Sequence, residues 1–373
     1  MTTVFVVNSG SSSIKWELLD AESGSVYSGG IVERIGEPGG GATDHDDGMQ
    51  QILAELGGEH PAVVGHRVVH GGAEFTQATV ITDAVAQRLE EISVLAPLHN
   101  PANLKGIRAA RATFSTVPHV AIFDTAFHGT LPPAAYTYAI DTELAQTHGI
   151  RRYGFHGTSY RYVADRAAAM LGKDLADLKL IVFHLGNGAS VCAIDGGRSI
   201  DTSMGMTPLE GLVMGTRSGD IDPGALFHLG RAGMDLPGLD HLLNRESGLL
   251  GMTGTGDMRD VQSAADGGDA RAQAALAVYY HRLRHYLGAY LIALAGADAV
   301  VFTAGVGENN ANTRLATVAG LETFGIEMDV AANAAANRSE RVVSAAASRV
   351  TVLVIPTNEE LQIARESVEA LTR

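Results

Sequence analysis

The chain has 373 residues, of which 46% are hydrophobic and 18% charged, and its net charge is −15. This length predicts about two domains, and the negative charge argues against nucleic acid or an anionic membrane surface as a partner. The single cysteine, Cys192, cannot form an internal disulfide, and no apolar stretch approaches the roughly 20 residues of a membrane span. The apolar start is too short for a signal peptide, so we expect a cytoplasmic protein.

Two glycine-bearing loops, far apart in the sequence, each join two short apolar runs that we predict to be strands. The loops and their flanking runs are Thr3–Val7, Asn8–Ser13 and Ile14–Leu19, and then Leu180–Phe183, His184–Ser190 and Val191–Ile194. A plain β-hairpin is the favoured explanation of the second loop alone, because Asn-Gly is a strong hairpin signal. Such a turn can also form an anion site. Since the pattern occurs twice, we predict two similar halves that face one another, with an anion between them.

The first half continues with a segment rich in Gly and Asp, from Gly36 to Gly48, which predicts an exposed loop. Helices are expected over Asp83–Leu95 and Asn103–Thr113. Between them, Pro97 and Pro101 indicate a turn over residues 96–101.

Two charged residues of this half stand within or directly after apolar runs. Arg67 lies within such a run, where an unpaired cation would be costly. It could pair with a protein carboxylate, or bind a carboxylate or phosphate of a ligand, and both alternatives stay open. Asp124 follows the predicted strand Pro118–Phe123. It could belong to a site at the carboxyl end of a sheet, or it could cap the next turn.

A histidine precedes the helix expected over Tyr160–Leu171. Thr158 or Ser159 could cap this helix, which places His156 at a helix N-terminus, where anions are favoured. A lone histidine is a weak signal, because most are simply satisfied by hydrogen bonds.

The stretch from Asp201 to Pro223 has many glycines and few features of a helix or strand. Arg217 lies in it between Gly215 and Gly219. A long irregular loop inside a compact domain is usually functional. Its last two residues, Asp222 and Pro223, predict the start of a helix.

Towards the C-terminus we expect a glycine-rich turn, a long helix buried in a core or a subunit interface, a strand, a partly helical surface segment and a last strand: Thr253–Val261, Ala270–Leu294, Ala299–Phe302, Ala331–Ala347 and Val350–Ile355. After Phe302, a glycine loop over Thr303–Asn309 leads into a helix from Ala311, which suits a nucleotide. Thr357 and Glu360 have the spacing of a capping box for the final helix. That leaves the carboxylate of Glu359 as a candidate magnesium ligand.

Together these segments resemble the acetate kinase family, within the acetate and sugar kinase/Hsc70/actin superfamily. The resemblance covers nearly the whole chain and rests on VNSGSSSIK, GHRVVHGG, LAPLHNP, FDTAFH, RYGFHGTS, HLGNGAS, DTSMGMTPLEGLVMGTRSGDIDP, FTAGVGEN and IPTNEE. Residues 201–223 are the most specific part. Tyr160 replaces the histidine usual in the family, Ala73 interrupts the usual GGE, and the region from Gly36 to His60 looks shortened.

The resemblance implies ATP as co-substrate and magnesium, or manganese in its place, held by Asn8 and Glu359. It makes Asp124 the active-site acid and gives His156 and Arg217 to transition-state stabilisation. Because acetate is already ionised at pH 7, Asp124 is expected to orient magnesium, through water, or the attacking group, and not to act as a base. The residues implied to contact ATP are Lys15, His184, Leu185, Gly186, Asn187, Gly188, Asp257, Met258, Arg259, Gly305, Val306, Gly307, Glu308 and Asn309.

For the second substrate the resemblance implies that Arg67 holds the carboxylate. It also implies a small apolar pocket for the methyl group, formed by Val69, Leu98, Phe155 and Pro208. Val69 lies two residues beyond Arg67 on the same apparent strand, so both side chains should share one face.

The implied fold is α/β, with two actin-like (ribonuclease H-like) domains of duplicated βββαβαβα type around a cleft. The domains would be residues 1–127, completed by a C-terminal helix over 361–373, and residues 128–360, which bind the nucleotide. The family is dimeric, so a homodimer is expected.

The implied activity is reversible transfer of the ATP γ-phosphoryl group to acetate. Direct transfer needs positioning and charge neutralisation, which the cationic residues offer, and no cysteine or serine–histidine nucleophile set is evident. A propionate or other short-chain carboxylate kinase is the nearest alternative. A sugar kinase would need Asp124 as a base and leave Arg67 without a partner, and an ATP-driven module without catalysis would need a client domain.

Overall fold

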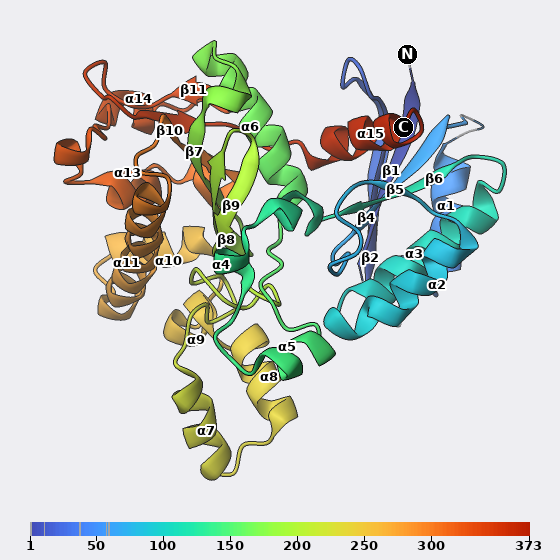
Figure 1. Cartoon of the computed structure of the whole chain (residues 1–373), viewed down its shortest axis with the longest axis horizontal. Coiled ribbons are helices and arrows are strands. Elements are labelled where there is room, and N and C mark those ends of the chain that lie inside the picture. Colours follow the sequence, from blue (N-terminus) through green and yellow to red (C-terminus); the bar gives the residue numbers. More distant parts are fainter. Residues whose placement is uncertain (1, 11, 37–38, 57, 59) are drawn as a thin grey trace.

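The computed structural model describes residues 2–10, 12–36, 39–56, 58 and 60–373. Within this part of the chain, two six-stranded mixed sheets form the framework, and helices cover both faces of each (Figure 1). The first sheet has the order β3-β2-β1-β4-β6-β5 and the second β11-β12-β10-β7-β8-β9. The strands are β1 (Thr3–Ser9), β2 (Ser13–Asp20), β3 (Val26–Glu33), β4 (Val63–Val68), β5 (Thr79–Val80), β6 (His119–Phe123), β7 (Lys179–Leu185), β8 (Ala189–Asp195), β9 (Arg198–Thr202), β10 (Ala299–Thr303), β11 (Arg341–Val342) and β12 (Thr351–Val354).

The α-helices of the described residues are α1 (His45–Glu55), α2 (Asp83–Glu91), α3 (Asn100–Thr113), α4 (Pro133–Tyr136), α5 (Thr142–Thr147), α6 (Gly157–Leu171), α7 (Pro223–Arg231), α8 (Leu236–Arg245), α9 (Gly248–Thr253), α10 (Met258–Asp266), α11 (Ala270–Ala293), α12 (Ala304–Asn309), α13 (Ala311–Val318), α14 (Val330–Ala334) and α15 (Glu359–Ala370). Short 3₁₀ helices span Ile92–Leu95, Ala126–Thr130, Leu175–Asp177 and Glu322–Phe324. None of the described helices combines the length and the apolar character that crossing a membrane requires.

The two sheets repeat one topology. In the first, β1 pairs antiparallel with β2 and parallel with β4, which pairs parallel with β6. In the second, β7 pairs antiparallel with β8 and parallel with β10, which pairs parallel with β12. The predicted duplication of two hairpin-bearing halves is therefore confirmed.

Alternation along β1 divides the core of the first half between two helical layers. Phe5 and Val7 pack on the side of α1 and α3, whereas Val4 and Val6 pack against α15. The last helix of the chain thus lies beside the N-terminal strand (Figure 1). Gly65 of β4 permits this close approach, because a Cβ there would lie 2.5 Å from Ser367 Oγ.

The second half buries its sheet in the same manner. Leu180 and Val182 of β7 pack with Val163 of α6, and Ile181 and Phe183 pack on the side of α11. Because α6 lies on this sheet and its N-terminus lies at the end of β6, it connects the two halves: Gly157 N donates to the carbonyl of Asp124 at 2.9 Å. A Cβ on Gly157 would lie 2.4 Å from that oxygen, so the contact requires glycine.

Several helix boundaries differ from expectation in the first half. The exposed loop predicted for residues 36–48 is wrong at its end, since α1 begins at His45 and Asp44 caps it by accepting from Asp47 N. Residues 37, 38, 57 and 59, in the region that looked shortened, and Ser11, in the first hairpin loop, lie outside the described residues. The turn predicted for residues 96–101 gives way to α3 at Asn100, because proline is tolerated in a first helical turn.

Two further corrections concern the second half and affect the site. Neither Thr158 nor Ser159 caps α6; the helix begins at Gly157 after His156, whose backbone is left-handed with φ 59°. The glycine loop predicted after Phe302 is instead α12, whose first residue, Ala304, has a left-handed backbone with φ 64°. The remaining shifts are in boundaries: α10 begins inside the predicted turn at Met258, β9 runs to Thr202, and α14 ends at Ala334.

Candidate active site

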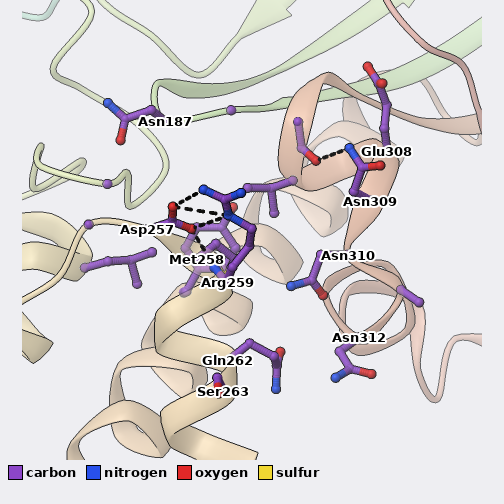
Figure 2. A pocket seen from close by; sticks show the side chains of 18 of the residues that line it. Asn187, Asp257, Met258, Arg259, Gln262, Ser263, Glu308, Asn309, Asn310 and Asn312 are labelled. Atoms are coloured by element: carbon purple, nitrogen blue, oxygen red, sulfur yellow. Dashed lines mark hydrogen bonds and ion pairs between the residues drawn. The ribbon is translucent and has the colours of Figure 1, made fainter. Parts of the chain in front are cut away.

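A cavity of about 1250 Å³ opens beside the β7–β8 turn, between the start of α10 and the helices α12 and α13 (Figure 2). Nine residues expected to contact ATP line it: Gly186, Asn187, Asp257, Met258, Arg259, Gly305, Val306, Glu308 and Asn309. Lys15, His184, Leu185, Gly188 and Gly307 are not among its lining residues. The cavity is larger than the roughly 300–1,000 Å³ common for ligand pockets, so it has room for a ligand as large as a nucleotide.

The sequence analysis missed part of this cavity wall. Gln262, Ser263 and Asp266 of α10 line it, as do Asn310 and Asn312 after α12. The spacing of Gln262 and Asp266, four residues apart on one helix, places them on one face and could have indicated their position. Their hydrogen bond, at 2.8 Å, fixes the Gln262 amide.

Asp257 is a helix cap as well as a cavity residue. It accepts from Arg259 N at 2.9 Å and from Arg259 Nε at 3.0 Å, as the dashed lines in Figure 2 show. The hydrogen bonds from Arg259 lower the pKa of Asp257 to about 2. The carboxylate therefore holds the Arg259 side chain at the mouth of the cavity.

The turn between β7 and β8 lies next to Gly215 of the irregular segment. Gly215 N donates to the carbonyl of Asn187 at 2.9 Å, and a Cβ on Gly215 would lie 2.0 Å from the Asn187 side-chain oxygen. Glycine at this position therefore lets the irregular segment approach the turn with the Asn187 side chain where it lies.

Two histidines stack at the junction of α6 and β7. The ring centroids of His156 and His184 are 4.1 Å apart with an interplanar angle of 18°. Burial lowers the pKa of His184 to about 4, and burial together with His184 lowers that of His156 well below its ordinary value. Both rings are therefore neutral at pH 7, when each carries a single N–H donor.

Arg217 is a half-buried cation whose guanidinium makes no ion pair within the described part of the chain. Its Nη1 donates to the carbonyl of Pro208 at 3.0 Å. Burial and the neighbouring Arg245 lower its pKa, but the group stays charged at pH 7. A Cβ on Gly188 would lie 3.5 Å from this Nη1 and 3.8 Å from His156 Nε2, so both groups face the β7–β8 turn.

Arg67 and Asp124 form a bidentate ion pair at the carboxyl ends of β4 and β6. Arg67 Nε and Nη2 donate to the two Asp124 oxygens at 2.9 and 2.7 Å. Burial disfavours the charge on Arg67, yet Asp124 and Glu359 raise its pKa above the ordinary value. Burial raises the pKa of Asp124, against the opposing effect of Arg67. The first alternative for Arg67, a protein carboxylate as partner, is thus observed. Three of its five N–H donors make no hydrogen bond to the residues that the structure describes and remain for a ligand.

The expected magnesium residues come from two adjacent elements. Asn8 follows Val7, which pairs with His66 in the neighbouring strand, so it lies beside Arg67. Glu359 opens α15 with its carboxylate 3.9 Å from Arg67 Nε, and its charge contributes to the raised pKa of Asp124. No cluster of three or more His, Cys, Asp or Glu suited to a metal occurs among the described residues. Two carboxylates and an amide nevertheless fit magnesium, which usually keeps several waters.

The residues expected around the acetate methyl group are only partly brought together. Val69 packs against the apolar cluster that contains Phe155, and Pro208 contacts Arg217. Leu98 is 51% exposed. The shared strand of Arg67 and Val69 is wrong, because β4 ends at Val68 and Val69 N instead donates to the Asn103 side chain.

His99 is a residue near these groups to which the sequence analysis assigned no role. Burial lowers its pKa, and Arg217 and Arg67 lower it further. The sequence feature that could have pointed to His99 is its position in the LAPLHNP motif.

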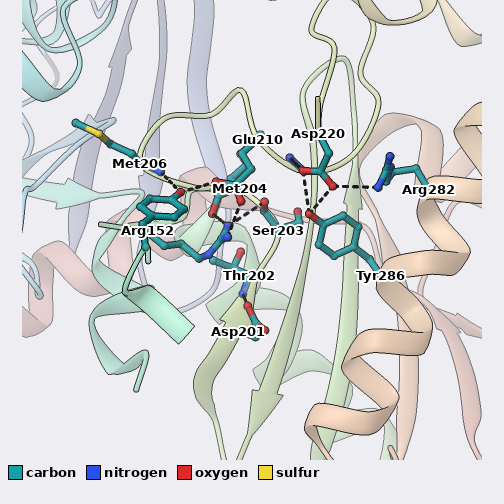
Figure 3. Close-up of polar contacts among 12 residues, drawn as sticks. Arg152, Asp201, Thr202, Ser203, Met204, Met206, Glu210, Asp220, Arg282 and Tyr286 are labelled. Atoms are coloured by element: carbon teal, nitrogen blue, oxygen red, sulfur yellow. Dashed lines mark hydrogen bonds and ion pairs between the residues drawn. The ribbon is translucent and has the colours of Figure 1, made fainter. Parts of the chain in front are cut away.

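The irregular segment is held by two polar clusters (Figure 3). Arg152 donates to Glu210 at 2.6 Å, and Tyr138 hydrogen bonds to the same carboxylate. At the far end of the segment, Asp220 accepts from Tyr286 at 2.9 Å and from Arg282 at 3.2 Å, both on α11. These clusters fix the segment on either side of Arg217.

The capping box predicted at the start of α15 is wrong. Asn358 caps the helix by accepting from Leu361 N, while the Thr357 hydroxyl contacts Ser159. Glu360 forms an ion pair with Lys15, a residue expected at ATP. Glu359 is still separate from the cap, as predicted, although for a different reason.

The whole chain matches known carboxylate kinases. The sequence profile of the acetokinase family matches residues 3–365. The chain belongs to the acetokinase family.

Individual relatives agree with this family assignment. The chain is 58% identical to the acetate kinase of Leifsonia xyli subsp. xyli, over 100% of this chain and 99% of that protein. Its structure resembles the Porphyromonas gingivalis acetate kinase, with a TM-score of 0.95, 42% identity and full coverage of both chains. It also resembles a propionate kinase from Francisella tularensis subsp. tularensis, with a TM-score of 0.93, 38% identity and coverage of 99% and 100%.

Membership of the acetokinase family confirms the resemblance drawn from the motifs. The two-domain α/β fold expected from that resemblance is also confirmed, by the duplicated sheets and by these structural neighbours. Carboxylate-directed phosphoryl transfer is the activity that the family carries.

Proposed function

We propose that this chain catalyses reversible transfer of the ATP γ-phosphoryl group to acetate, which forms acetyl phosphate and ADP by direct in-line transfer. The observation that carries the proposal is the arrangement of three groups. Arg217, a cation without a counter-ion among the described residues, and His156 face the β7–β8 turn, whereas Arg67 has N–H donors to spare at the ends of β4 and β6. The phosphoryl donor, ATP, and the acceptor, acetate, are both anionic and could meet between these three cationic or hydrogen-bonding groups.

In this proposal Arg67 binds the acetate carboxylate with the donors that Asp124 leaves free. Asp124 orients the guanidinium, since both of its oxygens accept hydrogen bonds from Arg67. A sugar kinase would need Asp124 to take a proton from a hydroxyl group. A carboxylate engaged in this way is poorly placed for that, which favours a substrate that is already ionised.

The nucleotide would occupy the cavity beside α10, with its phosphates at the β7–β8 turn. There Arg217 neutralises charge on the transferring group, and neutral His156 donates a hydrogen bond from Nε2. Such groups stabilise charge that develops in the transition state and need no covalent intermediate.

Asn8 and Glu359, with Asp124 beside them, would hold magnesium, or manganese in its place. The bound ion would neutralise charge on the nucleotide phosphates. This assignment is supported by the proximity of Glu359 to Asp124, because a divalent cation would relieve the repulsion between the two carboxylates.

The acid would be short. Val69 and Phe155, which share one apolar cluster, would limit its length. One methylene group discriminates by only about 1–3 kcal/mol, so propionate should be a poorer substrate and not an inert one. A propionate kinase is the second candidate, supported by the likeness to the Francisella tularensis propionate kinase.

We further propose a cytoplasmic homodimer with residues 1–127 and 361–373 as one domain and 128–360 as the other. Apolar side chains exposed on this single chain, Phe227 of α7, Leu236 of α8 and Ile292 of α11, support a partner surface. The reduced, buried Cys192 is compatible with the cytoplasm. Light scattering coupled to gel filtration would determine the subunit number.

The activity is tested by measuring ADP release with magnesium-ATP and a panel of acceptors: acetate, propionate, butyrate, glycerol and glucose. We expect the highest kcat/KM with acetate, about 10–200-fold less with propionate, and no sugar-dependent ADP. Higher kcat/KM with propionate would identify the second candidate. ADP release that depends on glucose or glycerol alone would overturn the proposal.

A further inference from the structure

A buried pair of hydroxyl groups lies at the Nδ1 edge of the His156 ring. Ser190 Oγ of β8 is 2.8 Å from His156 Nδ1. The hydroxyl of Tyr160, one turn further along α6, hydrogen bonds to the same Oγ. Ser190 and Tyr160 are both 0% exposed, so no solvent competes for these bonds.

The direction of these hydrogen bonds follows from the donors available. Tyr160 makes one hydrogen bond to the described residues, with Ser190, and burial keeps its hydroxyl protonated by raising its pKa. If Tyr160 accepted that bond, its own O–H would be a buried donor without a partner, at a cost of about 1–3 kcal/mol. Tyr160 therefore donates to Ser190, and the Ser190 proton is left for His156 Nδ1.

The tautomer of His156 is then determined. A neutral imidazole that accepts at Nδ1 carries its proton on Nε2. Nε2 is the nitrogen beside Gly188 and Arg217, and it makes no hydrogen bond to any described residue. The opposite tautomer would direct a lone pair towards phosphate oxygens, which would repel them.

We propose that Tyr160 is a positioning residue, which acts through Ser190 to hold His156 with its proton on Nε2 for donation to the transferring phosphoryl group. The inference rests on the proposed kinase reaction for its purpose, but the hydrogen-bond chain itself exists without substrate. Tyr160 is also the position at which this chain differs from the histidine usual in the family.

The neighbouring histidine has a similar but less restricted chain. His184 Nδ1 is 2.8 Å from Ser159 Oγ, which is 2.8 Å from Thr357 Oγ1. Either hydroxyl can be the donor there, so the tautomer of His184 does not follow from these contacts. Only the chain that ends in Tyr160 determines which ring nitrogen is protonated.

The test is long-range ¹H–¹⁵N NMR of the histidine-labelled protein, which distinguishes the two imidazole tautomers, together with steady-state kinetics. The variants are Tyr160→Phe, Ser190→Ala and the double variant, with His156→Gln to assign the resonance. Tyr290→Phe is the matched control, because it removes a buried tyrosine hydroxyl that bonds neither to His156 nor to Ser190. Thermal unfolding of each variant checks that the fold is intact.

In the wild type we expect the His156 proton on Nε2. In Tyr160→Phe a fraction of Nδ1-protonated ring should appear, and kcat should fall about tenfold, as for about 1.4 kcal/mol of lost transition-state stabilisation. KM for ATP and acetate should be little changed. The double variant should be no slower than Ser190→Ala, since both substitutions interrupt one chain.

A wild-type proton on Nδ1, or an unchanged tautomer in Tyr160→Phe, would overturn the inference. Multiplicative losses of kcat in the double variant would do so too. Because the tautomer is observed without substrate, a wild type with the expected tautomer but no activity on any carboxylate would count against the proposed function and leave the hydrogen-bond chain supported.

Discussion

At the scale of single residues, the charge on Arg217 is the feature most directly suited to a transition state. Its guanidinium lacks an acidic partner among the described residues and lies beside the β7–β8 turn. Arg217→Ala should lower kcat about 10³-fold or more, as for arginine fingers. Arg217→Lys should retain part of the activity, because the charge remains but the planar fork is lost.

The accompanying measurement is ADP and ATP affinity by calorimetry. Affinity should change little in Arg217→Ala, because the proposed role is confined to the transition state. If affinity fell as much as kcat, Arg217 would be a ground-state ligand of the nucleotide.

Two adjacent glutamates should differ in their effect on the metal. Glu359 lies near Arg67 and Asp124, whereas Glu360 is engaged with Lys15. Glu359→Ala should sharply raise the magnesium concentration needed for half-maximal rate, and Glu360→Ala should leave it close to wild type. The measurement is the rate of each variant as a function of free magnesium concentration. Identical curves for the two variants would contradict the assignment of Glu359 as a magnesium ligand.

The sequence predicted the candidate site residues better than it predicted which of them contact one another. Arg67 and Asp124 were both singled out from their places in or after apolar runs, but they lie 57 residues apart and no local pattern joins them. The capping box failed because Thr357 found another partner: its hydroxyl bonds to Ser159, nearly 200 residues away, and Asn358 takes the cap. Contacts between residues far apart in the sequence therefore determine which residue caps this helix.

At the scale of elements, the irregular segment depends on Gly215 to contact the β7–β8 turn. A Cβ there would lie 2.0 Å from the Asn187 side chain and 3.0 Å from the Gly256 carbonyl. Gly215→Ala should therefore displace the turn and raise KM for ATP about tenfold, equivalent to about 1.4 kcal/mol.

The control is Gly288→Ala on α11, where the added Cβ meets no atom within 4 Å. It should stabilise the protein by about 0.5–1 kcal/mol and leave KM unchanged, because alanine favours helix interiors. An unaltered KM in Gly215→Ala would show that the turn tolerates the added methyl group.

Strands were predicted better than helix starts, and the reason is physical. Apolar runs such as Leu180–Phe183 are buried on both faces of a sheet, so every residue in them is apolar and the strand can be predicted from the local sequence alone. The stretch after Phe302 carries glycines typical of a loop, yet it forms α12, which begins at Ala304 with a left-handed backbone. An alanine at φ 64° is not a turn signal that sequence alone supplies.

At the scale of the whole molecule, stability should fall in acid because of buried neutral histidines. Burial lowers the pKa of His70, His128 and His184 to about 4. In the unfolded chain these groups take up protons near pH 6.5. Between about pH 6.5 and 4 the unfolded state therefore binds more protons, and the free energy of unfolding decreases as the pH is lowered through this window.

Urea unfolding followed by circular dichroism at pH 7.5, 6.0 and 5.0 measures this effect. His128→Gln should weaken the dependence on pH, whereas the exposed His281→Asn should not. A free energy of unfolding that is flat from pH 7.5 to 5.0 would contradict the buried, neutral state of these rings.

The duplicated architecture was foreseeable because two similar strand–loop–strand patterns recur 177 residues apart, from Thr3 to Leu180. The return of α15 to the first sheet was foreseeable only through the family resemblance. Its apolar side chains look like those of any amphipathic helix, and the partner sheet is formed at the other end of the chain.

The most direct test of the central claim is to trap the product. Wild-type protein is incubated with magnesium-ATP, acetate and hydroxylamine, which converts an acyl phosphate to a hydroxamate, and hydroxamate and ADP are both quantified. Direct transfer to the carboxylate predicts equal amounts of hydroxamate and ADP from the wild type. Arg67→Ala should form both products much more slowly. Release of ADP in the presence of acetate without hydroxamate would contradict the account.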